Sequence, residues 1–249
     1  MSALDAVLIV LAGMAAGTIN TVVGSGSLIT FPTLIALGYP PVLANVSNNI
    51  GLVPGAISGA YGYRRELRGQ RRRLARLVPA SLTGGLAGAL LLLQLPNDVF
   101  ARVVIVLIVI ALALVIVQPR LSKRLAARRP EGARAVHGAL VMTVACAGIY
   151  GGYFGAAQGI ILISLLGIFL ADHLQRLNAV KNVLAGSVNL MASAVFVFAT
   201  QVDWTVVACI AGGSVVGGQI GATVGRRLDP RVLRALIVVV GISAIVRLA

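Results

Sequence analysis

Small and polar residues interrupt the first apolar stretch of the chain, Ala3–Leu37, at Asn20–Ser27. Each glycine in that interruption weakens a helix by about 1 kcal/mol relative to alanine. In hydrocarbon every freed backbone group must then find a partner, and a helix that restarts there presents N–H groups that can hold an anion. The predicted anion cradle is Gly24, Ser25, Gly26 and Ser27, and the adjoining Asn20, as an amide donor, and Thr21 are also predicted to bind the substrate. We expect Ser25 or Ser27 to be the N-cap of the following helix. The alternative interpretation is a close helix crossing, since small residues let backbones approach.

Amides and one lysine are the further candidates for binding a solute. Asn48 and Asn182 are predicted amide donors, with Asn49 as a weaker one, and interhelical hydrogen bonding is the alternative role. Lys181 is predicted to neutralise an anionic substrate, the alternative being a helix-end lysine that extends to the membrane surface. Gln158 completes the set at a second glycine-rich interruption.

Enzyme chemistry is not what these residue types indicate. A serine nucleophile needs a base within hydrogen-bond reach, and His137 and His173 lie at the ends of apolar segments. Neither the histidines nor Cys146 and Cys209 have metal-ligand spacing. We therefore predict no enzyme, no catalytic residue, no metal and no cofactor. An intramembrane serine hydrolase and a non-transporting membrane scaffold are the alternative functions.

Composition places the chain in a membrane. Of 249 residues, 58% are hydrophobic and 11% charged, and the mean hydropathy is +0.96, whereas soluble domains carry about 25% charged residues. The net charge of +14 gathers in short segments between apolar stretches. Cytoplasmic loops collect Lys and Arg in this way, so we predict no nucleic-acid partner. The prediction is a multi-pass protein of the inner membrane with segments 64–76 and 119–135 in the cytoplasm.

The apolar segments predict an all-α polytopic fold, because a span needs about 20 apolar residues. Stretches 3–37 and 136–171 are too long for one helix, and each contains a break: near Gly24–Ser27 in the first, and at Gly151–Gly152 and near Gly155–Gln158 in the second. Helices are predicted at 3–22, 27–38, 42–62, 77–94, 99–118, 178–199, 204–225 and 232–248, with further helices inside 136–171.

The two halves of the sequence match. Gly24–Ser27 aligns with Gly155–Gln158, Val46–Ile50 with Val180–Leu184, and Gly84–Ala89 with Gly217–Ala222, in one order and at nearly one shift. Equivalent connections carry opposite charge bias, so equivalent helices should run in opposite directions. This predicts two inverted repeats of about five hydrophobic helices each, residues 1–118 and 136–249, joined by the basic linker 119–135.

Each overlong stretch either crosses the membrane twice or forms a re-entrant hairpin, and both give the same parity. We favour two crossings, which makes five per repeat with the N-terminus outside. Inverted repeats with broken helices hold their substrate between the halves, near the middle of the bilayer.

The segment Gly17–Pro32, with its Asn20-Thr21-Val22-Val23-Gly24-Ser25-Gly26-Ser27 core, resembles the signature of the TauE/SafE sulfite exporter family, as does Ala44–Gly55. The resemblance covers essentially the whole chain. It implies a secondary transporter that exports small sulfur-containing anions such as sulfite or organosulfonates by alternating access, linked to the proton motive force. The implied partners are a small anionic substrate and the lipid bilayer, with a homodimer as an open alternative. The sequence departs from a strict repeat at Ala156-Ala157-Gln158, where glycine and serine would be expected.

Overall fold

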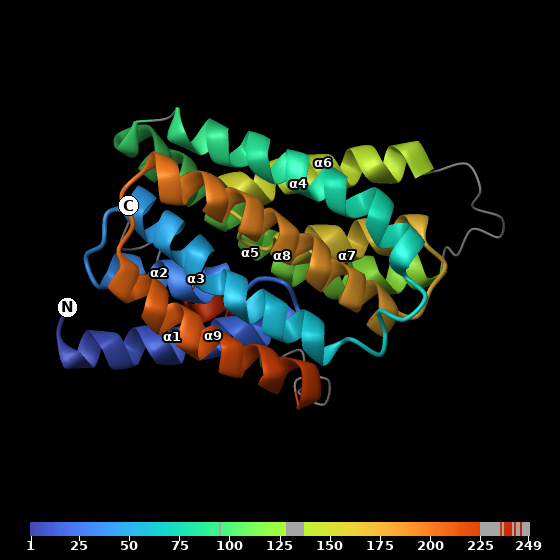
Figure 1. The fold of residues 1–249 in the computed structure, drawn as a ribbon, viewed down its shortest axis with the longest axis horizontal. Helices are drawn as coiled ribbons and strands as arrows, with labels where there is room; N and C mark the ends of the chain where they lie inside the picture. Colours follow the sequence, from blue (N-terminus) through green and yellow to red (C-terminus); the bar gives the residue numbers. More distant parts are fainter. Residues whose placement is uncertain are drawn as a thin grey trace.

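The computed structural model describes residues 1–94, 96–127 and 137–224, together with 235, 237–240, 242 and 245. Every regular element in this part of the chain is an α-helix, so the all-α prediction is confirmed. The helices are α1 (Ala3–Val22), α2 (Ser27–Ala36), α3 (Pro41–Gly62), α4 (Arg71–Leu93), α5 (Asn97–Ala127), α6 (His137–Tyr153), α7 (Gln158–Phe169), α8 (Leu174–Ala199) and α9 (Trp204–Thr223). They run roughly along one common direction (Figure 1). Helices α1, α4, α8 and α9 are long and apolar enough to cross a membrane.

Three predicted boundaries are wrong, each for a local reason. Helix α4 begins at Arg71, inside the predicted loop 64–76, and α5 continues to Ala127, inside the predicted linker 119–135. Arginine and lysine are good helix formers, so a run of charges does not by itself end a helix. Helix α6 continues through Gly151–Gly152, where the sequence predicts an interruption. Most of the helix predicted at 232–248 lies outside the described residues.

The first overlong stretch forms a hairpin. Helix α1 and the half-length α2 pack against one another, and the N-terminus and the α2–α3 connection lie at the same end of the molecule, at the left of Figure 1. Helix α2 has 10 residues and α7 has 12, which at 1.5 Å per residue is about 15–18 Å. The hydrocarbon core is about 30 Å thick. Helices of this length are shorter than a full span, which favours the re-entrant alternative, and the number of crossings stays a prediction.

Helix packing is symmetric under exchange of the halves. Helix α1 packs on α9 as α6 packs on α4, α3 packs on α9 as α8 packs on α4, and α3 and α8 pack on one another. The matching glycine blocks occupy equivalent places: in α4, Gly84 and Gly88 lie against the α6 backbone, and in α9, Gly217 lies against the α1 backbone. Two inverted repeats would require this symmetric pairing of helices. The repeats and their boundaries stay a prediction.

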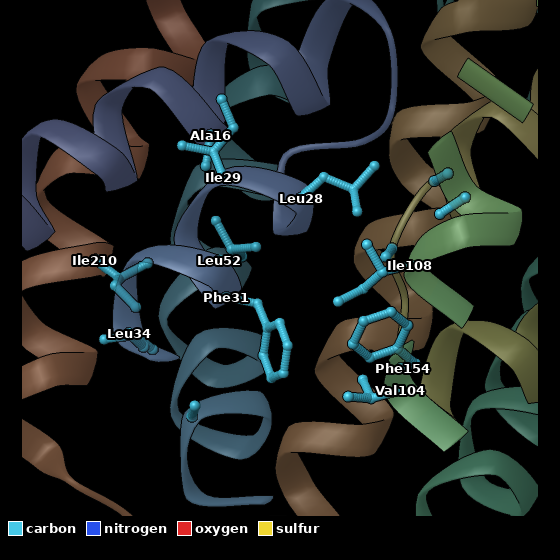
Figure 2. Close-up of a cluster of buried hydrophobic side chains, with 14 of the residues drawn as sticks. Ala16, Leu28, Ile29, Phe31, Leu34, Leu52, Val104, Ile108, Phe154 and Ile210 are labelled. Carbon is cyan, nitrogen blue, oxygen red and sulfur yellow. The ribbon is translucent and has the colours of Figure 1, made fainter. Parts of the chain in front are cut away.

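The apolar core joins the first break to the second. From α2, Leu28 and Phe31 point toward Ile108 of α5 and toward Phe154 (Figure 2). The Phe31 and Phe154 rings meet edge to face, with centroids 5.3 Å apart, a favoured aromatic geometry. Because Phe154 directly follows α6, the helix that restarts after the first break packs on the segment that forms the second.

Candidate functional site

The first break is four residues of non-helical chain between α1 and α2. Gly24 has a φ of +91°, a left-handed conformation that glycine adopts at little cost. Gly26 is the N-cap of α2 and supplies no side-chain hydrogen bond, so the predicted Ser25 or Ser27 cap is wrong. A side chain at Gly26 would collide with the Ala16 carbonyl, which explains why this position has none.

The amides at the start of α2 are only partly used. The N–H of Leu28 donates to Ser25 O at 3.1 Å, and the N–H of Ile29 donates to Gly26 O at 2.9 Å. No hydrogen bond runs from the N–H of Gly26 or Ser27 to another described residue. These two donors belong to the first turn of a helix, where orphan N–H groups favour an anion.

The second break, Phe154–Ala157, separates α6 from α7. Gly155 has a φ of +78°, and Ala157, the N-cap of α7, has a φ of 59°. For an alanine this left-handed conformation costs roughly 1–2 kcal/mol, so the surrounding packing holds the turn in place. Gln158 is then the first residue of α7 and is buried.

The two breaks touch. The N–H of Gly159 donates to Gly24 O at 2.9 Å, and a Cβ added to either glycine would collide with the other residue's Cα. The close-approach interpretation therefore holds for Gly24. In this arrangement the two glycine backbones meet directly, so no solute fits between them.

Buried polar atoms without partners flank that contact. Ser25 Oγ and Gln158 Nε2 have no hydrogen-bond partner among the described residues, and each belongs to the residue next to one of the contacting glycines. Buried polar atoms are normally bonded, and leaving one unsatisfied costs about 1–3 kcal/mol. A hydroxyl and an amide NH₂ that can both donate are thus available at the breaks.

The lack of a described hydrogen-bond partner for the Ser25 hydroxyl is also relevant to the alternative of a serine hydrolase. The Ser25 hydroxyl makes no hydrogen bond to a base in the described part of the chain, although a serine nucleophile needs one. His173 is the exposed N-cap residue of α8, and the side chain of His137 lies outside the described residues. Among the described residues no group of three metal-binding side chains occurs either.

Lys181 lies inside the molecule, with 0% of its surface exposed. The alternative in which it extends to the membrane surface is therefore wrong. Its Nζ donates to Asn20 O at 3.0 Å and to Thr21 O at 3.2 Å, two carbonyls in the last turn of α1. No described carboxylate forms an ion pair with it. The lysine of α8 thus caps the end of the broken helix, where the helix dipole is negative.

Two asparagines of α8 reach the same carbonyl. Asn178 Nδ2 donates to Thr21 O at 3.1 Å and Asn182 Nδ2 donates to it at 3.3 Å. Sequence reasoning missed Asn178. Its spacing from Lys181 and Asn182, at i, i+3 and i+4, places all three on one helix face and could have revealed it.

The second break has a related cap from the first half. Asn45 Nδ2 of α3 donates at 3.0 Å to the carbonyl of Tyr153, the last residue of α6. In the aligned halves the two asparagines are offset by one position, since Asn45 lies opposite Ala179 and Asn178 opposite Ala44. A carbonyl at the end of each broken helix therefore accepts a hydrogen bond from an asparagine of the opposite half. Of the two described helix ends, only that of α1 also accepts a hydrogen bond from a lysine.

The remaining predicted residues, Asn48 and Asn49, form hydrogen bonds between neighbouring helices. Asn48 Oδ1 accepts from the Thr30 hydroxyl of α2, and Asn49 Oδ1 accepts from Ser193 Oγ of α8 at 3.2 Å. Both side chains are buried. They fix the helices around the breaks, and the structure brings neither into the group of donors at Thr21 O.

A cavity of about 220 Å³ opens between α3 and α8. Asn182 lines it together with Ser187 and small residues of both helices, among them Ala56 and Gly186. Of the predicted site residues, Asn182 alone lines this cavity.

Comparison with known proteins finds membrane transporters that match nearly the whole chain. A family model described as Sulfite exporter TauE/SafE matches residues 9–248. "Probable membrane transporter protein YfcA" of Escherichia coli strain K12 is 28% identical over 238 residues, which covers 91% of this chain and 83% of the relative. A "Probable membrane transporter protein" of Haemophilus influenzae is 26% identical over 227 residues, covering 91% and 88% of the two chains. "Probable membrane transporter protein ORF9" of a Sinorhizobium species is 26% identical over 246 residues, covering 95% and 89%.

Proposed function

Because this chain belongs to the sulfite exporter TauE/SafE family and is a multi-pass membrane transporter, we propose that it exports a small sulfur-containing anion. Sulfite and short organosulfonates are the proposed substrates. Transport proceeds by alternating access between two inverted repeats and is linked to the proton motive force. In the inner membrane, segments 64–76 and 119–135 face the cytoplasm, as their basic residues favour.

The burial of Lys181 is the observation that carries this proposal. An ammonium in a low-dielectric interior is costly unless it is paired. The helix end that it contacts through Asn20 O and Thr21 O offers only about half a negative charge. An anionic substrate at this position supplies a full one, which favours anions over neutral solutes of the same size.

The unused donors at the two breaks suit an oxyanion. Ser25 Oγ and Gln158 Nε2 have no described partner, and the N–H groups of Gly26 and Ser27 donate to no described residue. A sulfite or sulfonate group presents three oxygens, each an acceptor, to this set of donors. Sulfite and sulfonate therefore match the site in charge and in hydrogen-bonding chemistry.

The contact of the two breaks supports the proposal of alternating access. While Gly24 and Gly159 are hydrogen bonded, the substrate cannot pass between the backbones at that point. We propose that one repeat rocks against the other, separates this pair and admits the anion to the donors. The described arrangement is then a closed state of the cycle.

Transport by purified protein in liposomes tests the proposal. Sulfite and a short alkanesulfonate should cross when a pH gradient is imposed, and an ionophore that dissipates the gradient should slow them. Lys181→Met should reduce sulfite flux by about tenfold or more, since a substrate charge loses its partner. Arg68→Met, which removes one positive charge at an exposed position, should transport normally.

Three results would contradict the proposal. The first is no transport of a sulfur oxoanion by folded wild-type protein, the second is transport at the wild-type rate by Lys181→Met, and the third is an equal loss of flux in Arg68→Met and Lys181→Met. Size-exclusion chromatography and thermal unfolding in detergent establish that each variant is folded.

A further inference from the structure

A second cavity, of about 400 Å³, lies at the start of α4. Arg72, Arg73 and Arg76 line one part of it. Leu77, Leu140 and Leu170 line another, from α4, from α6 and from the end of α7. The cavity thus has guanidinium groups and an apolar wall together, at the end of an apolar helix bundle.

Its arginines differ in their partners. The guanidinium of Arg73 is held by Asp172, with Nη1 2.8 Å from the carboxylate Oδ2. Arg72 and Arg76 are exposed and form no ion pair with a described residue. They are four positions apart on α4, so they share one face and repel one another unless an anion lies near both.

We propose that this cavity binds an anionic phospholipid, with the headgroup phosphate at Arg72 and Arg76 and an acyl chain against the leucine wall. Guanidinium groups bind phosphate through paired, charge-assisted hydrogen bonds. Basic pockets between membrane helices are suited to anionic headgroups. The opposite charges of headgroup and pocket remove the repulsion between the two arginines.

The apolar wall favours a lipid over a free anion. Leu77 and Leu140 are buried side chains beside the arginines, and a small oxoanion gains nothing from contact with them. A phospholipid uses both parts of the cavity, because its phosphate is attached to hydrocarbon. The bound lipid would bridge α4, α6 and the chain after α7.

Binding by the purified, detergent-solubilised protein tests this inference without reference to transport. Native mass spectrometry and thermal unfolding would be measured with phosphatidylglycerol, phosphatidylcholine and glycerol phosphate at matched headgroup concentrations. We expect one phosphatidylglycerol per chain, bound about tenfold more tightly than phosphatidylcholine, and a rise in unfolding temperature that glycerol phosphate does not reproduce. Equal binding of the two lipids would overturn the proposal, and so would equal protection by glycerol phosphate, which would indicate a free-anion site.

A matched pair of double variants locates the site. Arg72→Gln with Arg76→Gln should reduce phosphatidylglycerol affinity about tenfold, since both phosphate contacts are lost. Arg65→Gln with Arg68→Gln removes the same charge from exposed positions that do not line the cavity and should bind normally. An equal loss in both pairs would mean general attraction of lipid to a basic surface and would overturn the site. The wild-type comparison of lipids does not depend on the folding of either variant.

Discussion

At the scale of single residues, the buried polar side chains fall into two groups. Asn48, Asn49, Asn178 and Lys181 have hydrogen-bond partners in neighbouring helices. Ser25 Oγ and Gln158 Nε2 have none among the described residues. The first group stabilises the closed arrangement, whereas an unsatisfied donor destabilises it. Retention of such donors at the two breaks is reasonable if a ligand uses them during transport.

Removing the unsatisfied Ser25 hydroxyl should therefore leave stability unchanged or raise it, and should slow transport. Ser25→Ala should unfold at the same or a higher temperature, because it removes an unsatisfied hydroxyl worth about 1 kcal/mol or more, but it should slow sulfite transport. Ser81 is the matched control, since its hydroxyl is also buried without a described partner, but on α4. Ser81→Ala should be as stable as Ser25→Ala and transport normally. Equal transport by both alanine variants would remove Ser25 from the site.

At the scale of helices, small residues and one ionic cluster determine how the elements meet. Glycine blocks allow α1 to lie on α9 and α4 to lie on α6. Outside the membrane-spanning helices, Asp172 joins the starts of α4 and α8, because its carboxylate is 2.8 Å from Arg73 Nη1 and 3.0 Å from Arg176 Nε. Helix α4 is therefore held both by packing on α6 and by charge pairing with the start of α8.

A glycine comparison on α9 tests the packing. A Cβ at Gly217 would collide with the Met14 carbonyl of α1, whereas nothing lies within 4 Å of one at Gly212. Gly217→Ala should therefore destabilise the protein by about 1–3 kcal/mol through overpacking. Gly212→Ala should be neutral or stabilising by up to about 1 kcal/mol, since alanine is the better helix former. The unfolding temperatures of the two variants decide the matter, and equal values would contradict the close crossing.

The ionic cluster predicts a dependence of stability on pH. Burial raises the pKa of Asp172, but hydrogen bonds from Arg73, the His173 amide, Gln70 and Arg176 outweigh it and lower the pKa to about 2, from an ordinary 3.8. Because the folded state favours the ionised form, this stabilisation is complete above pH 3.8 and is lost as the pH falls toward 2.

Thermal unfolding of the wild type and Asp172→Asn checks this pH dependence. Near neutral pH the wild type should be more stable, by about 0.5–1 kcal/mol per pair since the arginines are partly exposed. The difference should shrink toward pH 2, where the wild-type carboxyl is largely protonated. A difference that stays constant across this range would show that the carboxylate charge is not its cause.

At the scale of the whole molecule, the two halves meet through their breaks. Gly24 and Gly159 are hydrogen bonded, and Asn45 and Asn178 each cap the broken helix of the other half. The two halves differ in charge, because in the described part of the chain Lys181 contacts the end of α1 and no lysine contacts the end of α6. Opening one half against the other must therefore break the glycine contact and alter the capping of both helices together.

Closing this contact should be essential for the transport cycle. Gly159→Ala places a Cβ against the Gly24 Cα, so it should disfavour the closed state and reduce flux by about tenfold, while substrate binding changes less, since only the balance between states is shifted. Gly167→Ala, on the same helix but with nothing within 4 Å, should transport normally. Wild-type flux from Gly159→Ala would mean that the cycle does not require the contact.

The membrane fold and the position of the first break could be predicted from the amino-acid sequence. Glycine and proline act on the chain locally, so the non-helical residues between Val22 and Ser27 could be identified without knowing what surrounds them. The C-terminal end of α5 could not be predicted in this way. Basic residues indicate where a chain leaves the membrane, but they do not indicate where its helix ends.

Which residues the two breaks contact depends on the packing of distant helices. That Gly24 meets Gly159, and that Lys181 is buried at the end of α1 and not extended to the membrane surface, depends on how α8 crosses the other half. Residues more than a hundred positions apart make these contacts, and the pattern within a helix records which of its faces is polar but not which neighbour satisfies it. The candidate residues could therefore be read from the chain, whereas their partners follow from the packing of the two halves.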